Sequence, residues 1–534
     1  MIHHRPAYKI SAFPGCEGAP MQAVASADRR MCAFVSAVAS VFLGGRLQGT
    51  LYNANDAQVD EYVTEACAAF DIPEYRLALW ARSVAHAEDV PPLPSAEFAG
   101  LTLHQFQLGA IQTLTPAGGA LGLFCGAGKT VTGAAAAVHL MRSFHYAPRL
   151  WIGCPLNAIP AWERMRPFLA PFFTEIRIFS VDSAHKYVGL SPIGGVLILD
   201  ELHLLGGRET RRTKSCHTLR SRFDAGIGLT GTLVHSGVEA TLSYADLCVP
   251  GMSLFATRWA AGEHFKCLVK KKLGPRTVTA LEKPTGANRE RFLEWLARWC
   301  YMLRPESPEV RACLAIPEQA VHEVRLLEPW RDTVHEVADI ANQILAETGE
   351  LPHAQAVFHK LMHAGVEAKI DYLMENLDPT EQVAIAAFYR ESLDAMEEAL
   401  KTAGITYTRV DGDIKGEDRA ECERKFQDGE VKVFLGQMHA ASMSMNLQVA
   451  DLSFVLDLSW SAIDYEQWLF RVRRQGKGAG RSCNHFDLVG NKFQRAVLDR
   501  VQLGMDFSAE CSEYQEVKRS LTTERSTRET SPLH

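Results

Sequence analysis

The sequence lacks the features that mark a disulfide-bonded, membrane-spanning or strongly basic protein. Its 13 cysteines include no C-x-x-C pair, which argues against a zinc ribbon and against a disulfide framework. One apolar run, at 32–45, is shorter than the about 20 residues that cross a bilayer, and we expect it to form a buried helix. The net charge of −7 means that any contact with DNA or RNA would use local basic clusters. We therefore expect a cytoplasmic protein that does not enter a membrane.

With 534 residues, the chain is too long for one core and should form two to four domains. Short apolar segments alternate with helical ones in two regions, which is typical of parallel sheets built from β-α-β units. In the first region we expect strands at 121–124, 150–154 and 196–199, with a helix after residue 129. In the second region we expect strands at 383–388, 432–436, 454–458 and 485–489.

The same pattern predicts the domain boundaries. We expect a helical N-terminal domain of unknown role at 1–95, a first α/β lobe at 96–250, a helical and basic insertion at 251–315, a second α/β lobe at 316–505 and a polar, flexible tail at 506–534. A proline cluster at 91–94 separates the first two segments. No motif assigns a role to residues 1–95.

The segment LGLFCGAGKTVTG, at 121–133, contains a candidate phosphate-binding loop. Gly128, Lys129 and Thr130 match the end of the pattern G-x-x-x-x-G-K-[ST], in which backbone N–H groups and the lysine hold phosphates. The first glycine of the pattern is absent, because Leu123 stands in its place. The loop alone therefore leaves two interpretations open, a nucleotide site and an ordinary glycine-rich turn.

The segment LILDELH, at 197–203, supplies the carboxylates that a nucleotide site needs. An aspartate at the end of a buried parallel strand lies at the carboxyl edge of the sheet, where ligands bind in such folds. Asp200 would hold Mg²⁺ together with the hydroxyl of Thr130, and Glu201 would polarise the attacking water. A solvated acidic loop is the alternative, but the four apolar residues before Asp200 disfavour it.

A third element, within DYEQWLFRVRRQGKG at 464–478, offers positive charge for the γ-phosphate. On a helix, Gln467, Arg471 and Arg474 are i, i+4 and i+7, so the spacing predicts that all three project from one face. Arginines placed in this way can stabilise the charge that develops during phosphoryl transfer. A merely charged surface helix is the alternative.

Taken in order, LHQFQ, CGAGKT, DELH, GLTGT and the Q…R..R element resemble the motifs of superfamily-two helicases and translocases. The likeness is greatest to the Swi/Snf-type double-stranded-DNA translocase branch, because GCPLNAIPAWERMRPF at 153–168 is similar to its CP…W segment, with Trp162 at the tryptophan. The resemblance covers roughly residues 100 to 505. It implies an α/β fold of two RecA-like parallel-sheet lobes, with the helical insertion and the helical N-terminal domain as additions.

The resemblance also implies a role for each matching residue. Gln107 would contact the adenine, and Gly126, Gly128, Lys129 and Thr130 would bind ATP, with Mg²⁺ on Thr130 and Asp200. His203, Thr230 and Thr232 would couple hydrolysis to movement of the lobes. Gln467, Arg471 and Arg474 would complete the site from the second lobe, where Asp411 and Gly412 match another family element.

Two departures from the family pattern concern the second lobe and the GLTGT segment. Within AASMSMNLQVAD, at 440–451, Asn446, Leu447, Ala450 and Asp451 match the family, but Ser442 and Ser444 replace glycines. Serine does not adopt positive φ cheaply, so the loop and the coupling that depends on it are expected to differ. Leu233 also replaces a proline.

Three basic clusters could contact nucleic acid, because lysine and arginine supply most phosphate contacts. They are Arg208, Arg211, Arg212 and Lys214; Lys266 with Lys270, Lys271 and Lys272; and Arg473, Lys477 and Arg481. Each cluster taken alone is also compatible with a solvated surface.

We therefore expect a nucleic-acid-stimulated ATPase that translocates on duplex DNA by opening and closing its two lobes. RNA is not excluded, and protein partners could bind through residues 1–95. Two alternatives stay open: a strand-separating DNA or RNA helicase of the same superfamily, and an ATP-gated DNA-binding or assembly module of a repair, replication or defence complex.

Overall fold

The computed structural model describes residues 97–506 with short gaps, and outside that range residues 7–9, 22–24, 511 and 515. The gaps are 99, 145, 191–193, 232, 234–236, 250–251, 253–257, 274–275, 282–283, 317–318, 349–352, 379, 415, 442–444 and 474–482. Near the N-terminus only two short strands are described, β1 (Ala7–Lys9) and β2 (Gln22–Val24), which pair antiparallel. The expected helical domain at 1–95, the apolar run at 32–45 and the flexible tail otherwise lie outside the described residues.

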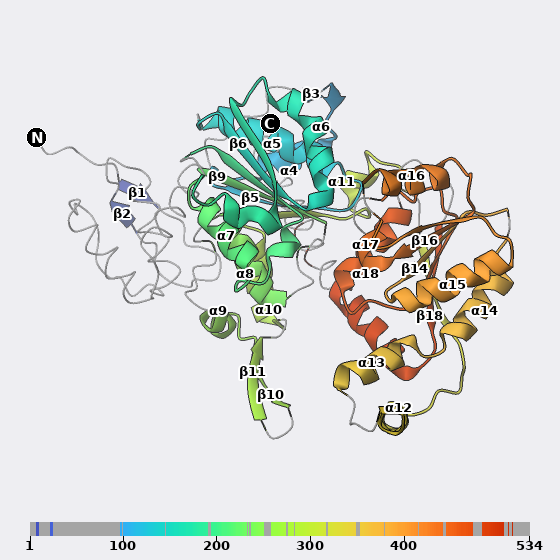
Figure 1. Cartoon of the computed structure of the whole chain (residues 1–534). Coiled ribbons are helices and arrows are strands. Elements are labelled where there is room, and N and C mark those ends of the chain that lie inside the picture. The colour runs from blue at the N-terminus through green and yellow to red at the C-terminus, as the bar shows by residue number, and fades with distance from the viewer. Residues whose placement is uncertain are drawn as a thin grey trace, which may run out of the picture. The chain divides into compact units, whose positions relative to one another are not determined.

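The chain divides into two compact units (Figure 1). Unit 1 consists of Met1–Leu123, Gly128–Arg304 and Cys511–His534, and unit 2 consists of Phe124–Ala127 and Pro305–Glu510. Each unit contains one six-stranded sheet. All the strand pairs of both sheets are parallel, which confirms the predicted fold class of two parallel-sheet α/β lobes.

The sheet of unit 1 has the strand order β12-β5-β9-β8-β6-β7. Its strands are β5 (Gly118–Leu123), β6 (Arg149–Cys154), β7 (Glu175–Ser180), β8 (Val196–Asp200), β9 (Ala225–Thr230) and β12 (Cys300–Leu303). Every residue of β5, β8 and β9 is buried, as parallel strands covered on both faces require. The strands predicted at 121–124, 150–154 and 196–199 are thus confirmed.

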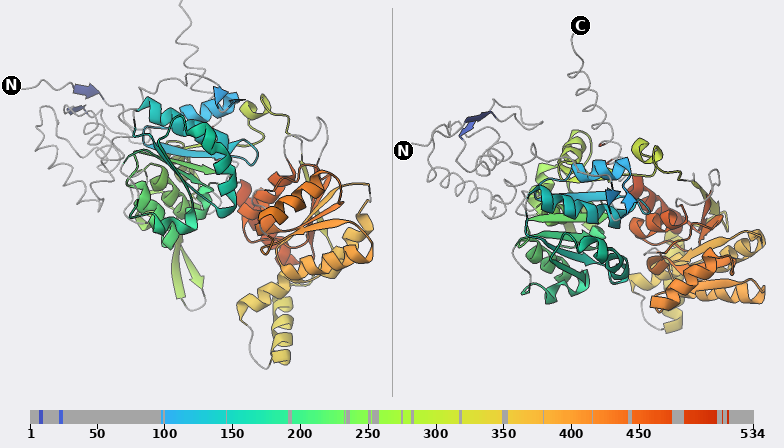
Figure 2. Two further views of the ribbon diagram at one scale, coloured as in Figure 1. Left: turned by 45° about the horizontal axis from the view of Figure 1, so that its top comes forward. Right: turned by 90° about the horizontal axis from the view of Figure 1, so that it is seen from above.

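Helices cover both faces of this sheet (Figures 1 and 2). The helices α4 (Gln105–Gln112), α5 (Lys129–Ser143) and α6 (Ile159–Leu169) pack together on one face, and α7 (Arg211–Arg220) and α8 (Gly237–Cys248) pack together on the other. The short 3₁₀ helices η1 (Leu156–Ala158), η2 (Val181–Lys186) and η3 (Leu202–Leu205) follow β6, β7 and β8. A two-stranded hairpin, β3 (Glu97–Phe98) with β4 (Leu101–Thr102), precedes α4.

The segment expected to be a helical insertion, at 251–315, also contains strands that the sequence analysis did not predict. Besides α9 (Arg258–His264), α10 (Ala287–Leu296) and α11 (Pro308–Arg311), it holds the antiparallel hairpin of β10 (Leu268–Leu273) and β11 (Arg276–Leu281). Figure 2 shows this hairpin projecting from its unit. The last strand, β12, is fully buried and joins the first sheet beside β5, so unit 1 continues to Arg304.

The sheet of unit 2 has the strand order β13-β18-β17-β14-β16-β15. Its strands are β13 (Gln319–Arg325), β14 (Val383–Ala387), β15 (Tyr407–Val410), β16 (Val433–Gln437), β17 (Leu452–Val455) and β18 (Cys483–Val489). The helices are α12 (Thr333–Thr348), α13 (Ala354–His363), α14 (Val366–Asn376), α15 (Arg390–Thr402), α16 (Gly416–Gln427), α17 (Met438–Ala441) and α18 (Ala462–Val472). The four strands predicted in this region are all present, with ends shifted by a few residues.

The core of unit 2 explains why its central strands are continuously apolar. In β14, Val383 and Ile385 belong to one buried cluster, whereas Ala384 and Ala386 belong to another. Because successive side chains of a strand point to opposite faces, both faces of this sheet are buried under helices. Within the part of the chain that the structure describes, no helix is long and apolar enough to span a membrane.

Candidate active site

The predicted phosphate loop connects β5 to α5, and its glycines have backbone angles that other residues rarely adopt. Gly126 has φ 94° and Gly128 has φ 75°, both in the left-handed region that favours glycine. Gly128 is the N-cap of α5, and Lys129 and Thr130 are the first two residues of that helix. A helix N-terminus presents unpaired N–H groups, which suit an anion such as phosphate.

Gln107 lies against this loop. A Cβ atom added to Gly128 would come within 2.7 Å of Nε2 of Gln107, so the end of the glutamine side chain packs directly against the loop. The Gln107 side chain is 5% exposed, and its Oε1 accepts a hydrogen bond of 2.8 Å from the backbone N–H of His104. The structure thus brings Gln107 to the phosphate loop, as a nucleotide-binding role requires. Its contact with adenine stays a prediction.

The two candidate carboxylates, Asp200 and Glu201, lie at the end of strand β8, which is near β5, the strand that precedes the phosphate loop. Asp200 ends β8, which is separated from β5 by β9 alone, so all three strands end at the same edge. Burial first, and then the charge of Glu201, raise the pKa of Asp200 to about 6. The positive charge of Lys129 lowers the same pKa. Lys129, which begins α5 after β5, and Asp200, which ends β8, therefore lie at the same edge of this sheet.

This arrangement fits a divalent cation. Asp200 and Glu201 are adjacent carboxylates, and Asp200 is buried, so their mutual repulsion is costly unless a cation compensates it. Oxygen ligands from a carboxylate and a hydroxyl are those that Mg²⁺ prefers. Asp200, with Thr130 beside Lys129, would supply them.

Trp162 makes a contact in this site that the sequence did not reveal. Its indole Nε1–H donates a hydrogen bond of 2.9 Å to Oδ2 of Asp200, and the backbone N–H of Glu201 donates one of 2.9 Å to Oδ1. Trp162 is fully buried in α6. The two donors fix the plane of the carboxylate and favour its charged form. The resemblance identified Trp162 as a family position, but only the fold shows what it contacts.

His203 joins Glu201 to the neighbouring strand. Glu201 has φ 51° and ψ 55°, an uncommon conformation for a residue with a side chain, and it caps the short helix η3 that carries His203. Nδ1 of His203 lies 3.3 Å from Oε2 of Glu201 and 3.3 Å from Oγ1 of Thr230, the last residue of β9. One predicted coupling residue, His203, is thus in contact with the catalytic candidate Glu201, and a second, Thr230, is in contact with His203. The third, Thr232, lies outside the described residues.

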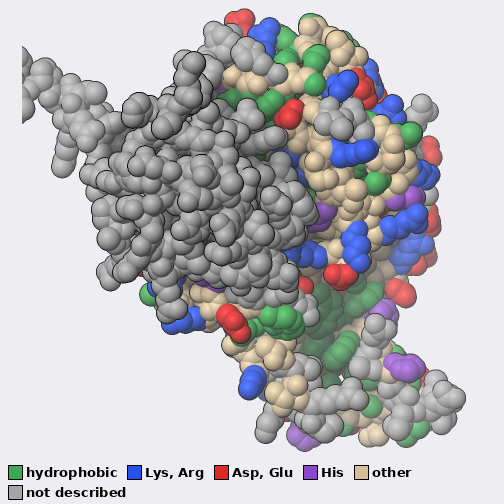
Figure 3. Space-filling view, turned by 90° about the vertical axis from the view of Figure 1, so that its left-hand side faces the viewer, with side chains coloured by type: hydrophobic (Ala, Val, Ile, Leu, Met, Phe, Trp, Pro, Cys, Tyr) green, Lys and Arg blue, Asp and Glu red, His purple; other side chains and the backbone are tan. Residues whose placement is uncertain are grey.

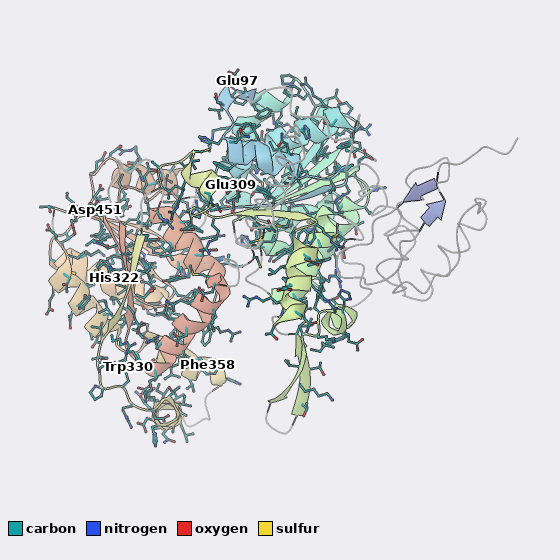
Figure 4. All side chains as sticks on the ribbon, turned by 180° about the vertical axis from the view of Figure 1, so that it is seen from behind. Glu97, Glu309, His322, Trp330, Phe358 and Asp451 are labelled. Atoms are coloured by element: carbon teal, nitrogen blue, oxygen red, sulfur yellow. The ribbon has the colours of Figure 1, made fainter. Side chains whose placement is uncertain are left out.

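In unit 2, helix α18 carries Gln467 and Arg471, which are 4% and 5% exposed. The helix begins near the end of the unit where Phe358 lies, and the ring of Phe358 packs there against Trp460 with ring centroids 6.3 Å apart (Figure 4). The helix ends near the amino end of β17, directly before which Asp451 lies. It stops at Val472, since Arg473 has non-helical angles. The prediction that Gln467, Arg471 and Arg474 share one helical face therefore fails beyond Arg471, and Arg474 lies outside the described residues.

The loop with the serine-for-glycine changes is anchored on both sides. Ser442 and Ser444 themselves lie outside the described residues. Before them, the Arg419 guanidinium donates a hydrogen bond to the carbonyl of Ala440, and after them its Nε lies 3.3 Å from Sδ of Met445. The N–H of Leu447 then donates to the carbonyl of Arg471, at 3.1 Å. The anchors from α16 and α18 connect this loop to the arginine-bearing helix.

The D-G element of unit 2 is also fixed by ion pairs. Asp411 is mostly buried and lies 3.0 Å from the guanidinium of Arg409 and 3.6 Å from that of Arg390. These charges, together with the N–H of Asp413, hold the pKa of Asp411 below its usual range. The N–H of Gly412 donates to Oε1 of Gln437, at 3.3 Å. The element is thus rigid, although its role stays a prediction.

Comparison with known proteins supports the motif assignment. The family model "Helicase conserved C-terminal domain" matches residues 368–476, which include α18. The helicase-like transcription factor of Mus musculus is 24% identical over 181 residues, which are 33% of this chain and 17% of that protein. The transcription regulatory protein SNF2 of Saccharomyces cerevisiae is 27% identical over 146 residues, 27% of this chain and 8% of that protein. The chain therefore resembles the Swi/Snf-type superfamily-two ATPases.

A further curated protein and a solved structure are also similar to this chain. A probable chromatin-remodeling complex ATPase chain of Oryza sativa is 34% identical over 145 residues, 26% of this chain and 13% of the rice protein. A solved structure described as the Sulfolobus solfataricus SWI2/SNF2 ATPase core in complex with dsDNA is 16% identical, covers 82% of this chain and 98% of its own, and has a TM-score of 0.38. The matches span 17% or less of the three curated relatives.

Several basic residues predicted to contact nucleic acid form ion pairs within the protein. Their partners lie at 2.7 Å for Arg208–Asp246, 3.2 Å for Arg212–Asp182, 2.7 Å for Lys214–Glu209 and 2.5 Å for Arg473–Glu306. On the face shown in Figure 3, Lys and Arg side chains are interspersed with Asp and Glu. These pairs reduce the charge that each cluster offers to phosphates.

Some of the other basic candidates are exposed on the surface, and others lie outside the described residues. Arg211 is exposed and has no acidic partner among the described residues, so it is the strongest candidate of its cluster. Lys266 and Lys270 are exposed, and Lys270, Lys271 and Lys272 belong to β10 of the projecting hairpin. Lys477 and Arg481 lie outside the described residues. All of these contacts stay predictions.

Proposed function

We propose that this Swi/Snf-type protein hydrolyses ATP and uses the energy to move along duplex DNA. One observation carries the proposal: Lys129, Asp200, Glu201, His203 and Thr230 meet at the carboxyl edge of one parallel sheet, in the order and chemistry of a nucleotide-hydrolysing site. The family relationship itself implies ATP hydrolysis. The movement and the duplex substrate are the further steps of the proposal.

In the proposed reaction, the residues of unit 1 bind ATP and activate water. The N–H groups at the start of α5 and the Lys129 ammonium hold the phosphates, and Gln107 contacts the adenine. Mg²⁺, held by Thr130 and Asp200, would neutralise charge on the phosphates. Glu201 orients a water molecule and accepts its proton as the water oxygen bonds to the γ-phosphorus. The bond between that phosphorus and the bridging oxygen breaks, and ADP is the leaving group.

The residues of unit 2 complete the proposed reaction. Arg471 and Arg474 stabilise the negative charge that develops on the transferred phosphoryl group, with Gln467 beside them. ATP binding would therefore favour association of the two units, and hydrolysis would release them. His203 contacts both Glu201 and Thr230, so a change at Glu201 during hydrolysis would also affect the end of β9 in unit 1.

DNA is the proposed partner because the curated relatives include chromatin-remodeling ATPases. Duplex DNA is favoured by the resemblance to the double-stranded-DNA translocase branch. The net charge of −7 requires that contacts come from local groups, and Arg211 and Lys270 are exposed candidates. Protein partners bound through residues 1–95 are a separate prediction.

ATP turnover with different nucleic acids tests this proposal. Turnover would be measured without nucleic acid and with duplex DNA, single-stranded DNA and single-stranded RNA, at about 50 and about 200 mM salt. We expect stimulation by duplex DNA that weakens at the higher salt, because phosphate contacts release counterions. Preference for a single strand would favour a helicase instead. Turnover that is indifferent to every nucleic acid would favour the ATP-gated module.

A further inference from the structure

Five buried side chains of unit 2 form a chain of hydrogen bonds beneath helix α18, and the backbone of the helix closes this chain into a ring. The members are Ser453 on β17, His485 and Asp487 on β18, and Tyr465 and Trp468 on α18, each no more than 1% exposed. Ser453 is paired with His485 in the sheet register, and Asp487 follows two residues later on the same face of its strand. The three strand residues thus lie next to Tyr465 and Trp468, which are about one turn apart on α18.

Four hydrogen bonds connect the members of the ring. Nε1 of Trp468 lies 3.0 Å from Oγ of Ser453, which lies 3.0 Å from Nδ1 of His485. Nε2 of His485 lies 3.2 Å from Oδ1 of Asp487, and the hydroxyl of Tyr465 lies 2.6 Å from Oδ2 of the same carboxylate. The backbone of α18 between Tyr465 and Trp468 closes the ring.

The donors and acceptors of the ring are compatible with one another. The indole of Trp468 can only donate, so Ser453 accepts from it. The Tyr465 hydroxyl and the Nε2–H of His485 both donate to the Asp487 carboxylate. The bond between Ser453 and Nδ1 of His485 can form with either group as the donor, so no two donors face each other. A fully satisfied buried network of this kind is rigid and specific.

The ring lies under the part of α18 that carries the candidate catalytic residues. Gln467 precedes Trp468 by one residue, and Arg471 follows Trp468 by one helical turn. Nonpolar packing would hold the helix against the sheet, but it allows small rotations and slides at low cost. Hydrogen bonds from Tyr465 and Trp468 to fixed positions on β18 and β17 restrict both movements, because they need defined distances and angles.

We propose that the Tyr465–Asp487–His485–Ser453–Trp468 ring is a positioning device that sets the rotation of α18 and, through it, the direction in which Arg471 projects. The inference rests on the proposed function of Arg471 in ATP hydrolysis. None of the five residues is among those proposed to bind nucleotide or Mg²⁺, so we assign them as positioning residues and not as catalytic ones. Loss of one hydrogen bond should leave the fold intact and displace the guanidinium, and a displacement of 1 Å can lower a rate by about 10²-fold.

Tyr465→Phe tests the proposal, with Tyr407→Phe as the matched control. The hydroxyl of Tyr407 donates a hydrogen bond of 2.7 Å to Glu397, so the control also loses a tyrosine–carboxylate bond in unit 2. Tyr407 lies on β15, at the edge of the sheet and away from β17 and β18. For each protein, kcat and KM for ATP would be measured, together with hydrogen–deuterium exchange of the α18 amides.

We expect Tyr465→Phe to lower kcat by about tenfold or more and to speed exchange in α18, while KM for ATP stays within about twofold. Tyr407→Phe should change neither kcat nor the exchange of α18. Ser453→Ala, which removes the hydroxyl between Trp468 and His485, is the second variant should Tyr465→Phe fail to fold. It should reproduce the loss of kcat.

Three outcomes separate this inference from the proposed function. If Tyr465→Phe and Ser453→Ala both keep wild-type kcat and wild-type exchange of α18, the ring does not position the helix. If both variants lower kcat no more than Tyr407→Phe does, the loss is a general effect on unit 2 and the inference is overturned. If the wild-type protein itself shows no ATP turnover with any nucleic acid, the proposed function has failed instead.

Discussion

Nδ1 of His203 lies 3.3 Å from Oε2 of Glu201, and the same nitrogen lies 3.3 Å from the hydroxyl of Thr230. The residue proposed to activate water is therefore in contact with a histidine that reaches the end of the neighbouring strand. Any change in charge at Glu201 alters its attraction for His203, and a shift of the histidine changes its contact with Thr230. These contacts therefore connect the proposed hydrolysis site to β9 of unit 1.

Glu201→Gln should abolish most hydrolysis and preserve ATP binding. The amide keeps the size of the side chain but cannot accept a proton from water, and a general base contributes about 10²- to 10⁴-fold. ATP affinity should change little, because Lys129 and the loop bind the phosphates. Glu163→Gln is the control, since Glu163 is half exposed on α6 and pairs with Arg166 at 2.6 Å. Wild-type turnover in Glu201→Gln would refute its assignment.

Arg471→Ala should lower turnover by about 10³-fold or more while ATP affinity is less affected, as expected for an arginine that acts in the transition state. Arg474→Ala should act in the same way. The control is Arg495→Ala, because Arg495 is also in unit 2 but is held by Glu323 and Asp499 outside α18. Steady-state kinetics of ATP hydrolysis measure kcat and KM for each variant. Equal losses of turnover in Arg471→Ala and Arg495→Ala would argue against a catalytic arginine.

Trp162→Phe should change the pH dependence of turnover. The indole N–H lowers the pKa of Asp200, so its loss should raise that pKa and leave more of the carboxylate protonated near neutral pH. Activity should therefore fall more at pH 6 to 7 than at pH 8 to 9. Trp151→Phe is the control, because Trp151 donates a comparable bond of 2.8 Å to Glu175. A uniform loss at all pH values in Trp162→Phe would contradict this explanation.

The buried lysine of unit 2 should make stability depend on pH. Burial lowers the pKa of Lys369 from 10.5 to about 8, despite the nearby charges of Asp457 and Asp487. Between these two pH values the unfolded chain binds more protons than the folded one, so stability rises with pH. Relative to Lys369→Met, wild-type stability should increase by up to about 3 kcal/mol from pH 8 to above 10. Urea unfolding at both pH values measures this, and a constant difference would contradict it.

The sequence predicts the parallel strands, and the position of Asp200 at the end of one of them, well because both depend on local patterns. The apolar run before Asp200 and the spacing of Gly128 and Lys129 each indicate one structural element. The hydrogen bond from Trp162 to Asp200 joins residues 38 apart, and the ring under α18 joins Ser453 to His485 across 32 residues. Such contacts depend on the order of strands in the sheet, which periodicity does not contain.

The hairpin of β10 and β11 and the end of α18 were missed for a different reason. KCLVKKK has no clear period of two, so the charge at 266–272 favoured a helix even though the chain pairs as strands. For α18, the spacing of Gln467, Arg471 and Arg474 assumed a helix that continues past Val472. Neither proline nor glycine follows immediately to indicate the stop.

Displacement of a third strand from a duplex separates movement along DNA from ATP-gated binding. A triplex with a long duplex flank would be incubated with the wild-type protein and ATP, with Glu201→Gln in parallel. We predict that the wild-type protein releases the third strand and that Glu201→Gln, although it binds ATP and DNA, does not. If the wild-type protein hydrolyses ATP on duplex DNA but leaves the triplex intact, the protein does not translocate.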